Sequence, residues 1–311
     1  MPLSKRSFSV ITNRPYWYMY VAGVVLLLLS GYLWWNKVYL SPERAFWGMV
    51  SNSLSTSGVT IETEQSADQS KLKQIVQMEL GATNRAHSLT TLTQGQTEVK
   101  TEIIGTKDAD YTRYRSIKTD QKNAQGKALD VSKVENVWSK SDDTQQTDTQ
   151  ASGHQLLAQA VLGIGLPVGS VPVPIGDVSA GKREDLVRQI KSQNVYETSF
   201  KAKDVVKEKK DGRTQYTYTV KIQTILYVRL MKEFAKDLGM KELDSVDPNT
   251  YQTTAPLNVK LTVDPVSRQL VAIDTGQGYK QTYAGYGLPL KVEIPKKPIT
   301  AEELQKRLSE L

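Results

Sequence analysis

The N-terminal part of the chain contains a long, uncharged and apolar stretch. No residue from Pro15 to Asn36 carries a charge. A helix of about twenty such residues is about 30 Å long, which matches the hydrocarbon core of a bilayer. The pattern therefore predicts one transmembrane helix over residues 16–36, so we expect a single-pass membrane protein.

Aromatic residues mark both ends of this stretch. Tyr16 and Trp17 lie at one end, and Trp34 and Trp35 lie at the other. Aromatic side chains gather where a membrane meets water, so these four are expected to be membrane-interface residues. A cleaved signal peptide is the alternative, but its apolar region is shorter and precedes small residues. The bulky sequence at the second end favours an uncleaved anchor.

The distribution of charge predicts the orientation of the helix. Lys5, Arg6 and Arg14 precede it without any acidic residue, and cationic flanks stay in the cytoplasm. Residues 1–15 are therefore expected to form a cytoplasmic tail, and residues 37–311 an extracytoplasmic domain at the cell membrane. The net charge of the chain is +7, of which these three cations leave +4 for the rest. This mild excess lacks the clustering typical of nucleic-acid binding.

The first half of the domain alternates between polar and apolar residues. Ser41 and Pro42 predict the start of a helix that ends near Leu54. Beyond this helix, a period of two predicts strands, and short polar connectors predict hairpins. The strands are expected at residues 59–65, 71–80, 87–93, 97–104, 111–117 and 134–140.

One predicted strand carries a polar residue on its apolar face. Leu72, Val76, Met78 and Leu80 share that face with Gln74. The opposite face carries Lys71, Lys73, Gln77 and Glu79. This arrangement predicts a sheet with one buried side and one side that faces solvent.

The second half mixes helices with strands. A short helix is expected at residues 155–162, and the segment Gly163–Gly176 after it is apolar but interrupted by Gly and Pro. Such a segment suits neither a helix nor a central strand. We expect a buried crossover there, with a lid and a membrane-touching loop as alternatives.

Further elements follow to the end of the chain. Helices are expected at residues 180–193, 225–238 and 300–311, and strands at residues 196–203, 215–222, 257–263, 269–275 and 290–294. Thr300 and Glu303 form a capping box for the last helix. Runs of strands with intervening helices predict one α+β domain with an antiparallel sheet.

The chain has few residues suited to catalysis or metal binding. It has no cysteine, which excludes disulfides, thiolate metal sites and a lipid-modified N-terminal cysteine. His87 and His154 lie far apart, outside any spacing typical of a metal site. Ser179 and Lys182 match an S-x-x-K nucleophile pattern without its companion motifs, and Ser179 is placed to cap a helix. We therefore expect no catalytic residue, no metal and no cofactor.

Several aromatic and aliphatic residues are candidates for the wall of a ligand cavity. They are predicted to face one another between the sheet and a helix. They are Met78, Trp138, Tyr216, Tyr218, Leu226, Leu230 and Phe234. Residue type leaves two interpretations open, which are an ordinary filled core and an apolar cavity.

The C-terminal part resembles a known family of envelope proteins. Residues 256–265 and 268–274 read as a strand pair, and residues 283–295 read YAGYGLPLKVEIP. Together with the order of the elements, this resembles the LolA-like superfamily, in particular its LppX/LprG branch. The resemblance implies a curved antiparallel half-barrel with helices on its concave side and an apolar cavity that binds lipids. Its members are usually anchored through a lipidated cysteine, which this chain replaces with a predicted transmembrane helix.

These observations predict a non-catalytic function at the membrane. The expected function is that of a membrane-tethered, extracytoplasmic binding protein for a lipid or another apolar ligand. The alternative is a structural or signalling module of the cell envelope that docks a protein partner on its surface. The expected partners are the lipid bilayer and either a lipid ligand or an envelope protein, with no nucleic acid.

Overall fold

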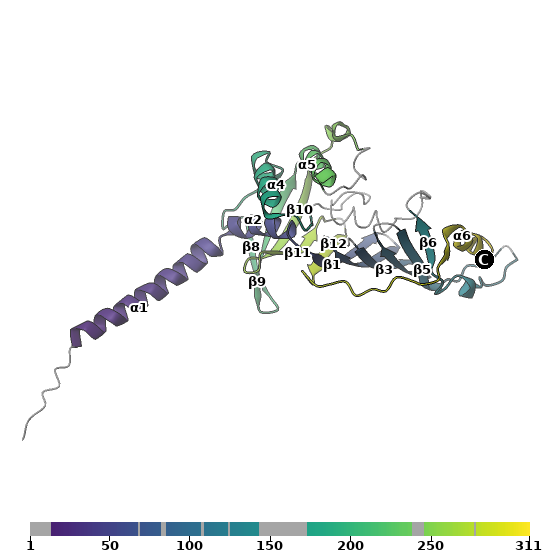
Figure 1. Cartoon of the computed structure of the whole chain (residues 1–311), viewed down its shortest axis with the longest axis horizontal. Helices are drawn as coiled ribbons and strands as arrows, with labels where there is room; N and C mark the ends of the chain where they lie inside the picture. The colour runs from purple at the N-terminus through teal and green to yellow at the C-terminus, as the bar shows by residue number, and fades with distance from the viewer. Residues whose placement is uncertain are drawn as a thin grey trace, which may run out of the picture.

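A computed structural model gives the fold of the chain. It describes residues 14–67, 69–81, 85–106, 109–123, 125–142, 173–237, 246–276 and 278–311. An N-terminal helix, α1 (Arg14–Trp34), projects from a body built on one large, mostly antiparallel sheet (Figure 1). The architecture is α+β, as predicted.

The apolar helix is long enough to cross a membrane. Its apolar span, Tyr18–Tyr39, has a mean hydropathy of 1.6, and none of it is buried against the body. By length and composition, such a helix suits a membrane span or a signal sequence. The helical path continues beyond residue 36, where we predicted its end, because a π-helical turn, η1 (Trp35–Tyr39), extends α1 to the body.

The strands of the first half form a meander. In chain order they are β1 (Gly58–Ala67), β2 (Ser70–Glu79), β3 (Arg85–Gln94), β4 (Thr97–Gly105), β5 (Ala109–Lys118) and β6 (Ser139–Asp142). Each pairs antiparallel with the next, as the predicted hairpins require. The predicted start of the last strand at residue 134 is wrong, because a 3₁₀ turn, η2 (Val131–Lys133), and irregular chain precede Ser139.

The second half supplies the other strands. They are β7 (Tyr196–Thr198), β8 (Val206–Lys210), β9 (Arg213–Ile222), β10 (Leu257–Asp264), β11 (Gln269–Asp274), β12 (Tyr279–Ala284) and β13 (Ile299–Thr300). The predictions missed β8, β12 and β13 and made β7 too long. The predicted strand at residues 290–294 is wrong, because this stretch pairs with no strand and forms an irregular segment with Leu290 buried.

All these strands belong to one sheet. Their order is β13-β6-β5-β4-β3-β2-β1-β12-β11-β10-β9-β7, and β8 also pairs with β9. The pairing of β1 with β12 joins the two halves, with Thr63 opposite Gln281. Among the described strands, only β13 and β6 run parallel. The ends of the sheet, β13 and β7, do not meet, so the sheet is not closed into a barrel.

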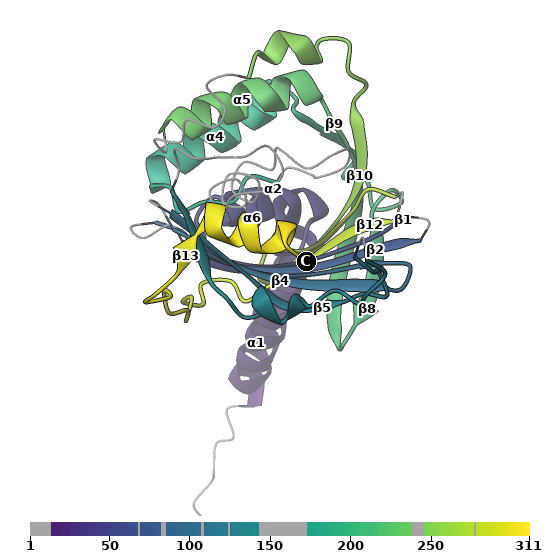
Figure 2. The same ribbon diagram turned by 90° about the vertical axis from the view of Figure 1, so that its right-hand side faces the viewer.

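The helices of the body lie mainly on one side of the sheet. They are α2 (Pro42–Ser53), α4 (Ala180–Ser192), α5 (Thr224–Asp237), α6 (Ala301–Ser309) and a 3₁₀ turn, η3 (Pro248–Tyr251). Figure 2 shows α2 and α6 on the same side of the sheet, which we call the inner face, with α4 and α5 above them. Thr300 Oγ1 accepts a hydrogen bond of 3.2 Å from the Glu303 N–H, which confirms the predicted cap of α6. Ser41 and Ser179 occupy N-cap positions, but their side chains make no capping hydrogen bond.

The predicted crossover is only partly described. The predicted helix at residues 155–162 and the larger part of Gly163–Gly176 lie outside the described residues. The end of that segment, residues 173–176, is buried. Gly176 N–H donates to the Ser53 carbonyl, and Thr56 N–H donates to the Gly176 carbonyl, both at 2.9 Å. This end of the segment is therefore fixed to the C-terminal end of α2.

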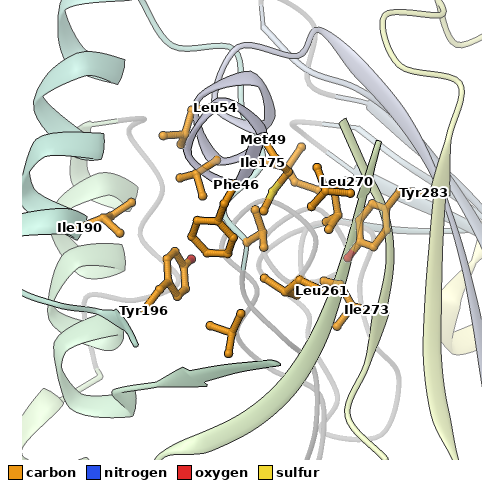
Figure 3. Close-up of a cluster of buried hydrophobic side chains, with 14 of the residues drawn as sticks. Phe46, Met49, Leu54, Ile175, Ile190, Tyr196, Leu261, Leu270, Ile273 and Tyr283 are labelled. Carbon is orange, nitrogen blue, oxygen red and sulfur yellow. The ribbon is translucent and has the colours of Figure 1, made fainter. Parts of the chain in front are cut away.

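The core lies between α2 and the inner face of β9–β12. Phe46 of α2 is fully buried. Its ring centroid lies 5.3 Å from that of Tyr218 and 5.5 Å from that of Phe200. Figure 3 shows Phe46 and Met49 of α2 directed toward the strand residues, among them Leu261. One face of α2 thus fills the space above the second half of the sheet.

The outer face of the first half carries a charged cluster. The side chain of Glu102 on β4 is 9% exposed, and its Oε1 lies 2.8 Å from His87 Nε2. Arg113 donates its Nε–H to Glu102 Oε2 at 2.8 Å. Burial opposes ionisation of the carboxyl, but the hydrogen bonds from His87 and Arg113 and the charge of Arg113 prevail and lower the pKa of Glu102 below 4.5. His87 therefore has a structural partner on the neighbouring strand.

Replacement of Phe46 tests the role of α2. We expect Phe46→Ala to lower the free energy of unfolding by about 3–5 kcal/mol, because the change removes buried area and leaves a cavity. Chemical denaturation followed by circular dichroism measures this value. Arg44→Ala, at an exposed position of the same helix, is the control and is expected to change it by less than about 0.5 kcal/mol. A small loss for Phe46→Ala would contradict the packing described.

The Glu102 cluster predicts a pH dependence of stability. Because its pKa is lowered in the folded state, Glu102 stabilises the fold above pH 4.5, and this contribution is lost as the pH falls through the lowered value. Glu102→Gln is expected to cost about 1.5–3 kcal/mol at neutral pH and to reduce the acid-dependent loss. Urea titrations across a pH series measure both effects, with the exposed Glu64→Gln as the control. Identical pH dependence in wild type and Glu102→Gln would exclude this role.

Candidate ligand-binding face

A row of uncharged polar side chains crosses the inner face of the sheet. Cross-strand pairing places each member directly opposite the next. This polar row consists of Gln281, Thr63, Gln74, Thr90 and Thr101. On β11 and β10, the same row continues with Ile273 and Leu261, which are fully buried beneath α2. The inner face is therefore apolar in its second half and polar in the middle of its first half.

Gln74 is the centre of a small hydrogen-bond network. Its Nε2 amide donates to Ser88 Oγ at 3.2 Å and to Thr90 Oγ1 at 3.3 Å. The amide carbonyl of Gln74 accepts no hydrogen bond from the described residues, and the side chain is half-buried. At the other end of the row, Tyr283 donates its hydroxyl to Gln281 Oε1 at 2.8 Å. The row thus has acceptor capacity that the described residues do not use.

Tyr279 of β12 adds a buried hydroxyl to the same region. The residue is 6% exposed, and its hydroxyl oxygen makes no hydrogen bond in the described structure. Burial raises the pKa of Tyr279 to about 12, against a smaller opposite influence of the Thr63 and Gln281 side chains. The phenol is therefore neutral at physiological pH and keeps a proton to donate. The hydroxyl lies near the Thr63 and Gln281 side chains, and a hydrogen bond of normal geometry would offset part of the cost of burying it.

Beyond the polar row, the inner face becomes apolar again. Leu72, Leu92, Val99 and Ile117 lie opposite one another on β2 to β5. Leu92 is 42% exposed, and the other three are half-buried. We call this group the apolar rim. The polar row is therefore flanked by buried core on one side and by the apolar rim on the other.

This arrangement suits non-covalent binding. Its polar groups are hydroxyls and amides, which form hydrogen bonds with neutral groups but carry no charge to attract an ion. Among the described residues, no three His, Asp or Glu side chains come together as a metal site. The polar row and apolar rim together match a ligand that has both a hydrogen-bonding group and a hydrocarbon part.

The residues predicted to line a cavity lie in two different places. Six of them, Met78, Tyr216, Tyr218, Leu226, Leu230 and Phe234, pack in or against one hydrophobic core. Tyr218 is fully buried beneath Phe46, and its hydroxyl donates to the Pro42 carbonyl at 2.8 Å. Trp138 lies elsewhere, with the guanidinium of Arg113 over its ring at 4.6 Å. That these seven residues line a ligand cavity stays a prediction.

The predicted membrane-interface residues lie on the projecting helix. Trp34 and Trp35 are exposed, and Trp35 stacks on Tyr39 with ring centroids 4.4 Å apart. Tyr16 and Trp17 belong to the first turns of α1, and their side chains fall outside the described part of the chain. Each end of the predicted span is thus located on the helix.

A separate cleft of 260 Å³ lies near the end of α2. Its lining is mostly polar and consists of Asn52, Ser55, Thr56, Ser57, Gln269, Tyr286 and Gly287. None of the residues predicted to bind a ligand lines it. Tyr286 donates its hydroxyl to the Leu270 carbonyl at 2.8 Å, so the proton of this hydroxyl is already used within the fold.

Sequence reasoning did not identify the polar row as a site. One signal for it was present, because Gln74 interrupts an otherwise apolar face of β2. The other members lie on strands of mixed character, where Thr is common on either face. Their alignment depends on the exact register of the hairpins and, for Gln281, on the pairing of β1 with β12, which no local pattern indicates.

Comparison with known proteins adds no family assignment. No protein-family model matches the chain, and no curated protein matches its sequence.

Proposed function

We propose that this chain is a membrane-tethered, extracytoplasmic and non-catalytic binding protein for an amphipathic lipid. The observation that carries the proposal is the polar row between buried core and the apolar rim on the inner face. A sheet face that packs on helices is normally apolar. Buried hydroxyl and amide groups are costly unless they form hydrogen bonds, and the Gln74 carbonyl and the Tyr279 hydroxyl form none with the described residues.

The chemistry of the inner face indicates the class of ligand. The half-buried Gln74 carbonyl and the Tyr279 hydroxyl offer an acceptor and a donor for an uncharged polar group. Leu72, Leu92 and Val99 offer a surface for a hydrocarbon chain. A lipid with a neutral, hydrogen-bonding head, such as a hydroxyl- or glycosyl-bearing glyceride, has both properties. The resemblance to the LolA-like superfamily supports a lipid ligand, because it implies a half-barrel that binds lipids on its concave side. In this chain, the inner face would be that concave side.

The tether is supported by the character of α1. Its apolar side chains from Tyr18 to Trp34 are exposed rather than packed on the body. A helix with that surface is unfavourable in water, and a bilayer is the environment in which it is stable. The cations before it favour a cytoplasmic N-terminus, which puts the sheet on the other side of the membrane.

Native mass spectrometry with lipid extraction tests the function. The purified fragment that starts at Ser41 retains α2 and the whole sheet. We expect a stoichiometric lipid to remain bound, and chromatography of the extract to identify its head group. A fragment that is free of lipid and takes none up from vesicles would exclude a lipid ligand. It would favour the alternative of a module that docks a protein on its surface.

A matched pair of variants locates the ligand on the inner face. Gln74→Leu is expected to weaken lipid binding by roughly an order of magnitude, because it removes hydrogen bonds of about 1 kcal/mol each. Gln77→Leu makes the same change on the outer face of the same strand, at an exposed position, and should leave binding unchanged. Lipid occupancy in native mass spectra measures both. Equal effects of the two variants would show that the ligand does not lie on the polar row.

A further inference from the structure

One strand, β8, contributes no side chain to the core. Every residue of β8 is exposed, and β8 pairs only with β9. Asp211 and Gly212 join the two strands in a tight turn, with φ angles of 50° and 78°. A two-residue turn of this kind fixes the register and twist of a hairpin. We call residues 206–214 the basic hairpin. It is a defined projection whose existence the hydrophobic core does not explain.

The basic hairpin carries an excess of unpaired cations. Lys207, Lys209, Lys210 and Arg213 outnumber Glu208 and Asp211 within it. All these residues are exposed. None of the four cations forms an ion pair with another described residue, whereas lysines on β2 and β4 do. The cations are therefore available to an anionic surface.

The hairpin starts at the point where the anchor helix meets the body. Tyr216, which lies opposite Lys207, donates its hydroxyl to the carbonyl of Leu40 at 3.0 Å. Lys207 Nζ lies 5.0 Å from the centre of the Tyr216 ring. Lys209 lies on the same face of β8, one pair nearer the tip. Figures 1 and 2 both show the hairpin extending beside the end of α1, on the side of the body from which α1 leaves.

The junction itself is fixed by several contacts. Tyr39 of η1 donates its hydroxyl to the Val266 carbonyl at 3.3 Å, and the guanidinium of Arg268 lies 4.4 Å from its ring centre. Only two residues separate η1 from α2. No flexible linker therefore lets the body turn freely relative to α1. If α1 spans a membrane, the same edge of the body always faces that membrane.

We propose that the basic hairpin binds the anionic head groups of the membrane in which α1 is anchored. This inference rests on the tether in the proposed function but not on its ligand. Each cation near an anionic surface strengthens attraction by about fivefold. The attraction fades over about 8 Å at physiological ionic strength, so only side chains held close to the surface contribute. The hairpin would thereby set the tilt of the body on the membrane.

The absence of cysteine makes a direct test simple. In the full chain, a fluorophore on Thr214→Cys reports the position of the hairpin. The chain is reconstituted in vesicles of phosphatidylcholine, with or without phosphatidylglycerol, that carry a nitroxide quencher on the head group. We expect strong quenching with phosphatidylglycerol, weak quenching without it, and loss of the difference at high salt. A label on Glu310→Cys, at the end of α6, is the control and should be quenched little in both.

Charge-reversal variants distinguish an effect of the hairpin cations from an effect of the net charge of the whole chain. Lys207→Glu, Lys209→Glu and Lys210→Glu together should abolish the added quenching. Lys122→Glu, Lys127→Glu and Lys133→Glu change the net charge equally at exposed positions between β5 and β6, and should not. Equal quenching in both vesicle types, or equal loss in both triple variants, would overturn the inference.

Flotation with vesicles after an alkaline wash separates the two proposals. A chain that floats but shows no added quenching refutes the hairpin contact and leaves the tether in place. A chain that does not float refutes the tether, and the hairpin contact with it.

Discussion

The packing of α2 against the inner face is the interaction on which the rest of the structure depends. Phe46 and Met49 cover β10 and β11, and the end of α2 holds the buried end of the crossover through Ser53. The start of α2 lies two residues after η1, the last helical turn of the apolar helix. One amphipathic helix therefore joins the apolar helix, the second half of the sheet and the crossover into one unit, and its burial provides the hydrophobic free energy that holds them together.

The sheet uses its two faces differently in its two halves. Under α2 the inner face is apolar and filled, whereas further along β1 to β4 it presents hydroxyls and amides. On the outer face, charged residues such as Glu102 are satisfied by partners on neighbouring strands. Buried polar atoms without a hydrogen-bond partner among the described residues occur on both faces, for example Arg85 Nε on the outer face and the Tyr279 hydroxyl on the inner face. Stability alone would favour apolar residues on the inner face, and the proposed ligand would account for the polar ones.

Much of the fold could be predicted because the periodicity of apolar residues within short segments indicates most of its strands and helices. The alternation in β1 to β5 and the helical spacing of α2, α4 and α5 are visible in short windows of sequence. The missed and wrong elements lack this signal. β8 is charged on both faces, so its residues read as a solvated surface, and Leu290 is buried in a segment that alternates without pairing to any strand.

The candidate site was harder to predict than the fold. Gln74 stood out on an apolar face, but the row to which it belongs ends at Gln281, on a strand far away along the chain. The predicted cavity residues were chosen because they are aromatic or aliphatic, and six of the seven pack in or against the core. Trp138 illustrates the limit, because its aromatic character suited a cavity while its actual neighbour is the Arg113 guanidinium. Side-chain type indicates burial, and only strand order indicates which buried groups meet.

The pairing of β1 with β12 has a consequence for biosynthesis. Residues 60–65 form their ladder with residues 279–284, more than two hundred positions later. A growing chain therefore completes the meander of β1 to β6 long before β12, the second partner of β1, has been synthesised. Such distant contacts slow folding, and an open strand edge invites pairing with other chains. The free edge of β1 is thus exposed to pairing with other chains until nearly the whole chain has been synthesised.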